Sequence, residues 1–474
     1  MVQPELINIS AILNLSLLRK AQSIHRLLNA IISFSHVCNR LYACNTTIVS
    51  TAIVFAKEDA PELEASLWKS MGDTLRFQQQ YDEALFALSK ALELCRIAGD
   101  QKAAASNLLS LGILSKFTNK DEEAERFLHS ALDLYTKLDM PVGVARALRE
   151  LGEVYGRDRD RDRNDETERR VLRAALDIYE QIGSQQGKAD VLLALGHFDI
   201  VRGRLDEAKN ALTIALDLNN KLDHPLSQAN AMVELSHVYA RLHCGEKAEA
   251  TLQSALDIYR ALNNRLGQAI SFRHLGELYQ GQNLHDKAVH ALEAAAKLDG
   301  DLGDHQGKAH SLLVLGRSYL NLAQLDDAER SMGSALTLFR DLHDRRWESM
   351  TLLDLGHLRC LQRRYEEACN MLHSAHDIAA ELSDLQTQGV ALQRVGHVHR
   401  VCGGLATAQR CFEDALQLFE RAESVQNADI TRTDLEALRL KRQSIEGQEN
   451  TSQGVATMNQ SSEAQEVSVS STGG

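Results

Sequence analysis

A pair of residues, one large and apolar and the next one small, recurs along the chain at a nearly constant interval. The pair is found at Met71-Gly72, Leu111-Gly112, Leu151-Gly152, Leu195-Gly196, Leu235-Ser236, Leu275-Gly276, Leu315-Gly316, Leu355-Gly356 and Val395-Gly396. Successive pairs are 40 residues apart, except for one step of 44 residues between Gly152 and Gly196. A unit of this length holds two helices and a turn but is too short to bury a core by itself. The pattern therefore predicts a stack of helical repeats that bury their apolar faces against one another.

Two alanines accompany most of these pairs, at positions that suit the second helix of each unit. Because they are seven residues apart, about two helical turns, they lie on one stripe where small side chains let helices approach closely. A glycine inside a helix costs roughly 1 kcal/mol relative to alanine, so its regular recurrence also indicates close packing. The residues with this expected packing role are Gly72, Gly112, Gly152, Gly196, Gly276, Gly316, Gly356 and Gly396, with Ala91, Ala131, Ala175, Ala215, Ala255, Ala295, Ala335, Ala375 and Ala415. The earlier alanine is present in every unit except the third, which has Glu168.

This combination resembles the tetratricopeptide repeat. The family pattern has a Trp, then Leu-Gly, a Tyr three residues later and two small residues in the second helix, and the first unit contains Trp68, Met71, Gly72, Ala84 and Ala91. The tyrosine is present in four units, as Tyr155, Tyr239, Tyr279 and Tyr319, and the family's proline is missing from every unit. The longer polar connections resemble the 40-residue version of the repeat in Pins-type polarity scaffolds and in the sensor arrays of some signalling ATPases.

The resemblance implies an all-α fold, a right-handed α-solenoid of stacked antiparallel helix pairs (a TPR superhelix). We expect a degenerate N-terminal repeat or capping helices in residues 1–60, about nine repeats in residues 61–425 and a C-terminal capping helix in residues 426–445. The remaining residues, 446–474, have almost nothing to bury, which predicts a disordered tail.

The third unit contains the four extra residues and the sequence RDRDRDR at residues 157–163. Insertions in repeat arrays map to loops on one face. We therefore expect a solvated loop there, and the alternative is a docking loop for a charged partner.

Composition limits the cellular setting. The net charge of −13 argues against nonspecific binding to nucleic acid or to an anionic membrane. The eight cysteines lack the spacing of a zinc site, which favours a reducing, cytoplasmic location. The apolar segment Leu6–Leu18 raises the alternatives of a targeting segment or a membrane anchor, but Glu5 precedes it and it is too short to span a bilayer.

Motifs of catalysis are missing from the sequence. The segments Gly187-Lys188-Ala189 and Gly307-Lys308-Ala309 lack both the upstream glycine and the hydroxyl residue of a phosphate-binding loop. Neither H-E-x-x-H nor G-x-S-x-G occurs. We therefore expect no enzyme activity, no catalytic residues and no cofactor.

In the tetratricopeptide family the first helix of each unit lines a concave groove, and the residue after the glycine points into it. Counting from each glycine to positions minus six, minus three, plus one, plus four and plus five collects ten cations, Arg157 among them, and four acids, Asp73, Glu153, Asp190 and Glu277. This excess of positive charge predicts a groove for an acidic or carboxylate-bearing peptide, and the alternative is that the arginines lie on solvated faces. The expected groove residues are Lys69, Arg76, Lys116, Arg146, Arg149, His197, His237, Arg241, Arg273, Arg317, His357, His397 and Arg400.

Histidine follows the glycine position four times, at His197, His237, His357 and His397. In one interpretation these side chains satisfy local hydrogen bonds, and in another they make the groove sensitive to pH. Metal binding by histidines on separate repeats would require neighbouring helices to align them, and we expect no metal site.

The function that these patterns favour is a non-enzymatic scaffold or adaptor that binds a peptide or helix of another protein. One alternative is a regulatory or sensor array related to signalling ATPases but lacking the NTPase module. Another is a co-chaperone that binds chaperone C-terminal carboxylates, which calls for lysine and asparagine on adjacent repeats. The partner, the cellular process and the oligomeric state are left open.

Overall fold

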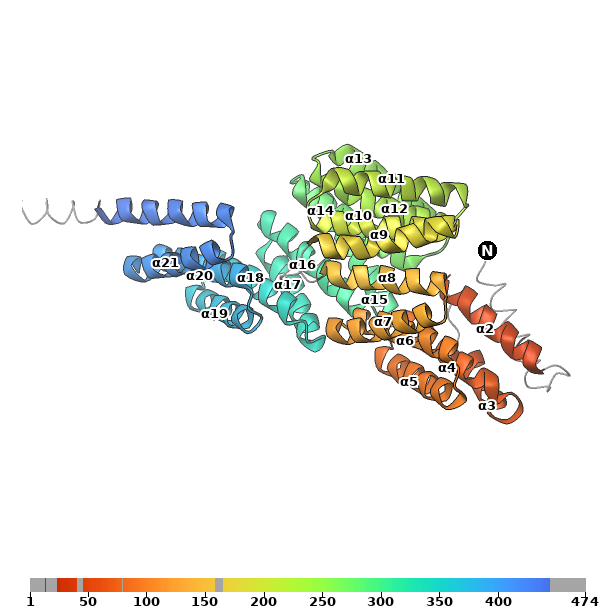
Figure 1. Cartoon of the computed structure of the whole chain (residues 1–474). Helices are drawn as coiled ribbons and strands as arrows, with labels where there is room; N and C mark the ends of the chain where they lie inside the picture. Colours follow the sequence, from red (N-terminus) through yellow and green to blue (C-terminus); the bar gives the residue numbers. More distant parts are fainter. Residues whose placement is uncertain (1–12, 14–23, 41–45, 79, 158–164, 444–474) are drawn as a thin grey trace, which may run out of the picture. The chain divides into compact units, whose positions relative to one another are not determined.

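The computed structural model describes residues 13, 24–40, 46–78, 80–157 and 165–443 (Figure 1). The chain divides into two compact units, residues 1–278 with 301–304 (unit 1) and residues 279–300 with 305–474 (unit 2). All regular secondary structure in the described residues is helical, and successive helices pack as antiparallel pairs. The predicted all-α fold class is confirmed.

Most helices are 17 residues long. The helices that begin in unit 1 are α2 (Ile24–Arg40), α3 (Thr46–Asp59), α4 (Pro61–Phe77), α5 (Tyr81–Ala98), α6 (Gln101–Phe117), α7 (Asp121–Lys137), α8 (Pro141–Arg157), α9 (Asp165–Gln181), α10 (Gln185–Val201), α11 (Leu205–Lys221), α12 (Pro225–Arg241), α13 (Gly245–Ala261) and α14 (Arg265–Gly281). Those that begin in unit 2 are α15 (His285–Leu302), α16 (His305–Asn321), α17 (Leu325–Asp341), α18 (Arg345–Leu361), α19 (Tyr365–Glu381), α20 (Leu385–Val401) and α21 (Leu405–Arg421). Residues 425–443 form a further helix, where we expect the C-terminal cap.

Each repeat consists of a first helix, which carries the glycine, and a second helix, which carries the alanines. The first helices are the even-numbered α4 to α20, and the second helices are the odd-numbered α5 to α21. The alanines of both registers are 0% exposed, as at Ala208 and Ala215 on α11. They lie in the interior between helices and leave no room for larger side chains.

The repeated glycine lies directly against a side chain of the second helix. A Cβ atom added at Gly196 would be 2.4 Å from Cγ of Leu212, and one added at Gly356 would be 2.7 Å from Cγ of Leu372. Carbon atoms in contact are about 3.5–4.0 Å apart, so neither position has space for alanine. The glycine therefore sets the distance between the two helices of a repeat.

A second class of glycine contacts is not evident from the Leu-Gly pattern. Gly143, Gly187 and Gly267 lie near the start of first helices, and a Cβ atom there would be 2.2–2.3 Å from a ring carbon of the tyrosine eight residues earlier. These tyrosines belong to the preceding second helix. Consecutive repeats are thus joined by the same kind of close approach that joins the two helices within one repeat.

The turns between helices repeat every 20 residues. A residue with positive φ follows nearly every helix, for example Gly303 (φ 72°), Ala323 (φ 57°) and Arg363 (φ 62°). The next backbone N–H donates to the carbonyl five residues earlier, as from Gln324 to Tyr319, which is the hydrogen bond of a Schellman motif. Only five of these positions are glycine, so other residues adopt the left-handed conformation at the rest.

Several expected features lie outside the described residues. They are the apolar segment Leu6–Leu18 except Leu13, the charged insertion after Arg157, and the tail 446–474. The side chain of Glu168 is not described either, although its backbone is part of α9. Among the described helices, none has both the length and the apolar character that crossing a membrane requires.

Candidate binding face on the first helices

Side chains on consecutive first helices meet in a fixed register. The residue after the glycine contacts the residue 37 positions later, which lies two before the next glycine. Thus His197 Nδ1 is 3.3 Å from Glu234 Oε2 and, in unit 2, Arg317 Nε is 2.6 Å from Asp354 Oδ2. The other contacts of this kind are Asp73 with Ser110, His237 with His274 and His397 with Asp434. We call each contact a rung.

The most buried group of charges on this face lies between α6 and α8. Lys116 Nζ is 2.5 Å from both Glu150 Oε2 and Glu153 Oε2, and Arg149 pairs with the same two carboxylates. Burial raises the pKa of Glu150, but the positive charges of Arg149 and Lys116 outweigh it and bring the pKa to about 2. Glu150 is 3% exposed. The four side chains therefore form a closed ionic network rather than free charges for a ligand.

Several other predicted groove cations are also occupied within the chain. Lys69 Nζ lies 2.7 Å from Asp73 Oδ2 on the same helix. Arg241 donates to the carbonyl of Ile200, one repeat earlier. Near the end of unit 2, Arg400 Nη1 is 3.6 Å from Asp434 Oδ1. The contacts of Arg241 and Arg400 join consecutive first helices, and all three cations have a partner inside the chain.

Two of the predicted cations stand apart. Arg76 on α4 and Arg146 on α8 form no salt bridge with any residue that the structure describes. The Arg76 guanidinium lies 4.3 Å from the Phe77 ring centroid and 5.3 Å from that of Phe117. Arg146 is exposed. Of the expected groove residues in unit 1, these two keep their charge most available.

The remaining histidines of the predicted groove differ in their surroundings. Burial and the nearby charge of Arg394 lower the pKa of His357. Burial also lowers the pKa of His397, against the opposite effect of Asp434. Both side chains are therefore neutral near neutral pH and add little to the charge of the face.

The template missed the residue two before each glycine. In five of the nine repeats that position holds an ionisable residue that belongs to a rung, to the ionic network or, for Arg394, to a contact with Asp354. These residues are Glu150, Glu234, His274, Asp354 and Arg394. A signal was present in the sequence, because positions minus two and plus one are three residues apart and share a helix face. Three residues at this position are acidic and one is arginine, so including the position lowers the predicted excess of positive charge by two.

Comparison with known proteins agrees with this architecture. The family model described as tetratricopeptide repeat matches residues 63–137 and 227–301. The chain therefore contains tetratricopeptide repeats. Such repeats generally mediate interactions between proteins. A search of curated protein sequences found no match.

Solved structures with similar folds include other repeat arrays. One is a signal transduction ATPase with numerous domains and a tetratricopeptide repeat sensor, from Pyrococcus horikoshii, with a TM-score of 0.54 and 13% identity. The match covers 80% of this tetratricopeptide repeat chain and 56% of the ATPase chain. A Rap protein complexed with competence and sporulation factor has a TM-score of 0.46 and 14% identity, over 71% of this chain and 98% of the Rap chain. At 13% identity the likeness to the ATPase concerns the fold.

Proposed function

We propose that the chain is a non-enzymatic adaptor that binds an acidic segment of a partner protein along the first helices of unit 1. The general role of tetratricopeptide repeats supports a protein partner. The observation that carries the proposal is the pair Arg76 and Arg146, whose guanidinium groups form no salt bridge with the residues that the structure describes. A carboxylate of the partner would supply the missing countercharge through charge-assisted hydrogen bonds.

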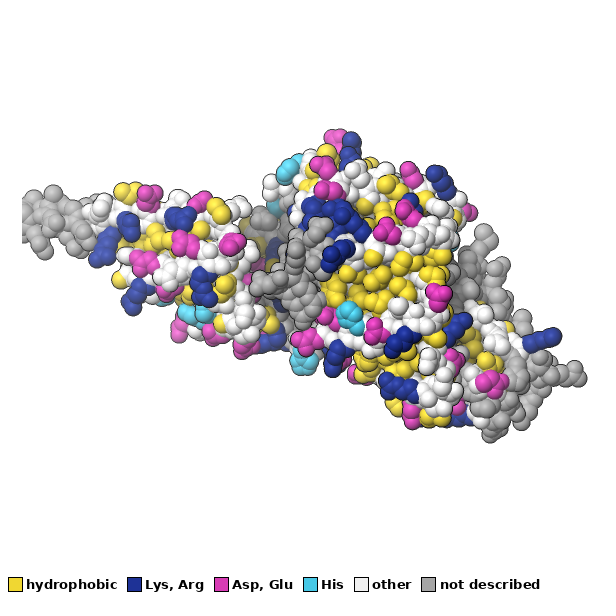
Figure 2. Space-filling model, viewed as in Figure 1, with side chains coloured by type: hydrophobic (Ala, Val, Ile, Leu, Met, Phe, Trp, Pro, Cys, Tyr) yellow, Lys and Arg dark blue, Asp and Glu magenta, His cyan; other side chains and the backbone are white. Residues whose placement is uncertain are grey.

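The surroundings of both arginines suit the binding of a peptide. Arg76 lies over aromatic rings, and Phe117 beside it is 47% exposed, so the site offers apolar contact as well as charge. Arg146 precedes the ionic network of α8, which holds this helix against α6. On the face of unit 1 seen in Figure 2, apolar side chains gather over α8 and α9, and Lys and Arg side chains adjoin them. Mixed apolar and basic surfaces of this kind bind acidic amphipathic segments.

The test is affinity purification with mass spectrometry, using the full chain as bait. The double variant Arg76→Glu/Arg146→Glu reverses both charges and retains all four side chains of the ionic network, although the charge of Arg146 contributes to the low pKa of Glu150. The matched control is Arg126→Glu on α7, because Arg126 is exposed and belongs to a second helix of the same unit. Arg149 is unsuitable for such a test, since its replacement would leave buried carboxylates without a partner.

We expect partners recovered by the wild-type chain and by Arg126→Glu to be lost with the double variant. Their binding to the wild-type chain should weaken as salt concentration rises. Equal recovery by all three baits, with no dependence on salt, would contradict a role for this basic face.

A further inference from the structure

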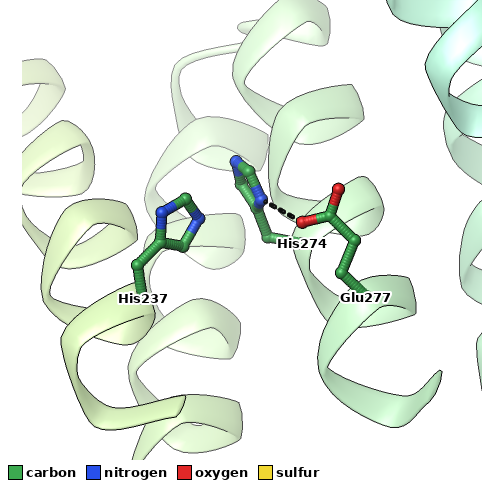
Figure 3. A group of neighbouring side chains, drawn as sticks. All are labelled: His237, His274 and Glu277. Carbon is green, nitrogen blue, oxygen red and sulfur yellow. Dashed lines mark hydrogen bonds and ion pairs between the residues drawn. The ribbon is translucent and has the colours of Figure 1, made fainter. Parts of the chain in front are cut away.

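We propose that His237, His274 and Glu277 form a binding site for a zinc ion between two consecutive repeats. His237 comes from α12, whereas His274 and Glu277 lie one turn apart on α14 (Figure 3). All three belong to unit 1. The proposal is independent of the peptide-binding function above, because it uses different residues.

The geometry brings three ligand atoms together. One nitrogen from each histidine and one carboxylate oxygen of Glu277 lie within 4.8 Å of one another. The two imidazole rings have centroids 4.1 Å apart and are nearly perpendicular, and His274 Nδ1 is 3.0 Å from Glu277 Oε2. Zinc binds nitrogen and oxygen at about 2.0–2.2 Å, so two ligands of a tetrahedral ion are about 3.4 Å apart. Small side-chain rotations would therefore bring all three atoms to bonding distance.

One ring nitrogen of His237, Nε2, is buried without a hydrogen-bond partner among the residues that the structure describes. A buried polar atom without a partner is destabilising, and coordination to a metal would satisfy it. Burial and the neighbouring His274 lower the pKa of His237 to about 4, so its imidazole is neutral near neutral pH and has a lone pair available.

The contact between His237 and His274 also differs from the other rungs in its chemistry. At the same register, Arg317 faces Asp354, His197 faces Glu234 and His397 faces Asp434, so in these three rungs a cation or histidine meets a carboxylate. His237 instead meets a second imidazole, and two neutral histidines gain little from each other. A shared metal ion would give this pair an attraction that two neutral rings lack. Consecutive first helices thus provide the alignment that a metal site on separate repeats requires.

The charges around the three ligands suit a divalent cation. Glu234 lies one turn before His237 on α12 and accepts a hydrogen bond from His197. Burial raises the pKa of Glu234, but His197, His237 and His274 lower it, and the net shift is downward. Arg273 lies close enough to influence Glu277. Two carboxylates and one guanidinium leave a net negative charge, which favours an added cation. Glu234 is placed to orient a histidine or to approach the ion itself.

The donor set favours zinc over hard cations. Imidazole nitrogen suits zinc and related transition metals, whereas magnesium and calcium prefer sites built from oxygen. Two histidines and one glutamate leave a fourth tetrahedral position for water or for a side chain of a partner. The Glu277 side chain is 45% exposed, so this ligand of the site is in contact with solvent.

The experiment measures zinc bound by the untagged full-length chain after removal of metal with a chelator. Isothermal titration with zinc chloride gives stoichiometry and affinity, and visible absorption of the chain loaded with cobalt(II) reports tetrahedral coordination. The variants are His237→Ala/His274→Ala, which removes both imidazoles, and Glu277→Gln, which keeps the size of an exposed side chain. The control is His224→Asn at the start of α12, because His224 is exposed, is 13 residues from His237 and occupies an N-cap position that asparagine suits.

We expect one zinc ion per chain for the wild-type protein and for His224→Asn, together with tetrahedral cobalt absorption. The double variant should lose that ion, and Glu277→Gln should bind it about tenfold more weakly or worse. Circular dichroism of the metal-free proteins shows whether the variants fold, and Glu277→Gln tests the site even if the double variant does not. Absence of stoichiometric zinc from the wild-type chain, or unchanged binding by Glu277→Gln, would overturn the proposal.

Discussion

Arg317 and Asp354 are 37 residues apart, and the Nε and Oδ2 atoms of their side chains are 2.6 Å apart. His237 and His274 occupy the same two positions in another pair of repeats. The backbone register is therefore constant while the chemistry of each rung varies. Rungs with opposite charges hold neighbouring repeats together, whereas the rung with two histidines is the one that we propose to bind a metal.

The rung between Arg317 and Asp354 should contribute modestly to stability. The Arg317 side chain is 32% exposed and that of Asp354 is 13% exposed, so we expect a coupling energy of about 0.5–1 kcal/mol. A double-mutant cycle with Arg317→Ala and Asp354→Asn, followed by urea unfolding, measures it. The exposed pair Lys90 and Glu93 is the control and should give about 0.3 kcal/mol. Equal coupling in the two cycles would mean that the rung is no stronger than a surface ion pair.

The ionic network of α6 and α8 predicts sensitivity to acid. The pKa of Glu150 is about 2 in the folded chain and about 4.3 in an unfolded one, so its ionised form stabilises folding above about pH 5. This contribution, up to about 3 kcal/mol, should fall as the pH drops from about 5 toward 2. Glu150→Gln removes it and should destabilise the chain at neutral pH by about 3 kcal/mol.

Denaturant unfolding at several pH values tests this prediction. The difference between the wild-type chain and Glu150→Gln should shrink as the solution becomes more acidic. The exposed residue Glu83 provides the control variant Glu83→Gln, whose effect should stay within about 0.5 kcal/mol at every pH. A difference that does not depend on pH would show that Glu150 acts through packing alone.

Two glycines in unit 2 should respond to alanine in opposite directions. At Gly356 a Cβ atom would be 2.7 Å from Leu372 Cγ, so Gly356→Ala should destabilise the chain by about 1–3 kcal/mol. Gly333 on α17 has open space around it, and Gly333→Ala should stabilise by up to about 1 kcal/mol through helix propensity. Urea unfolding of both variants checks the signs. Stabilisation by both would show that the helices move apart easily.

The inter-helix turns offer a further route to a more stable chain. Ala323 has φ 57°, a left-handed conformation that costs a residue with a side chain about 1–2 kcal/mol. We expect Ala323→Gly to stabilise by about 0.5–1 kcal/mol after the greater flexibility of glycine in the unfolded chain is subtracted. The reverse change, Gly303→Ala, should destabilise, because Gly303 has φ 72°. Thermal unfolding compares the two, and a lower melting temperature for Ala323→Gly would contradict the argument.

The fold could be predicted from the sequence because small residues recur at a regular interval. Glycine and alanine recur where helices approach, and the structure places a large side chain of the next helix against residues such as Gly196. The turns were harder to predict, because positions such as Ala323 and Arg363 do not look like turn residues. Their conformation follows from the helices on either side rather than from local preference.

The candidate site was only partly accessible. Listing cations at template positions identified Arg76 and Arg146, but the same list included Lys116 and Arg149, which the structure pairs with glutamates. Which charges remain available depends on contacts between repeats. Those contacts link residues that are 37 positions apart in consecutive repeats. A template that counts positions within a single repeat therefore does not reveal them.

The rungs also fix the order in which the repeats can be joined. Loss of one 40-residue unit, for example residues 318–357, would keep the helix lengths, the turns and the glycine spacing unchanged. Arg317 would then lie opposite Arg394, two like charges where an arginine and an aspartate now meet. Repeats that are alike in length are therefore not electrostatically equivalent at their contacts with the next repeat.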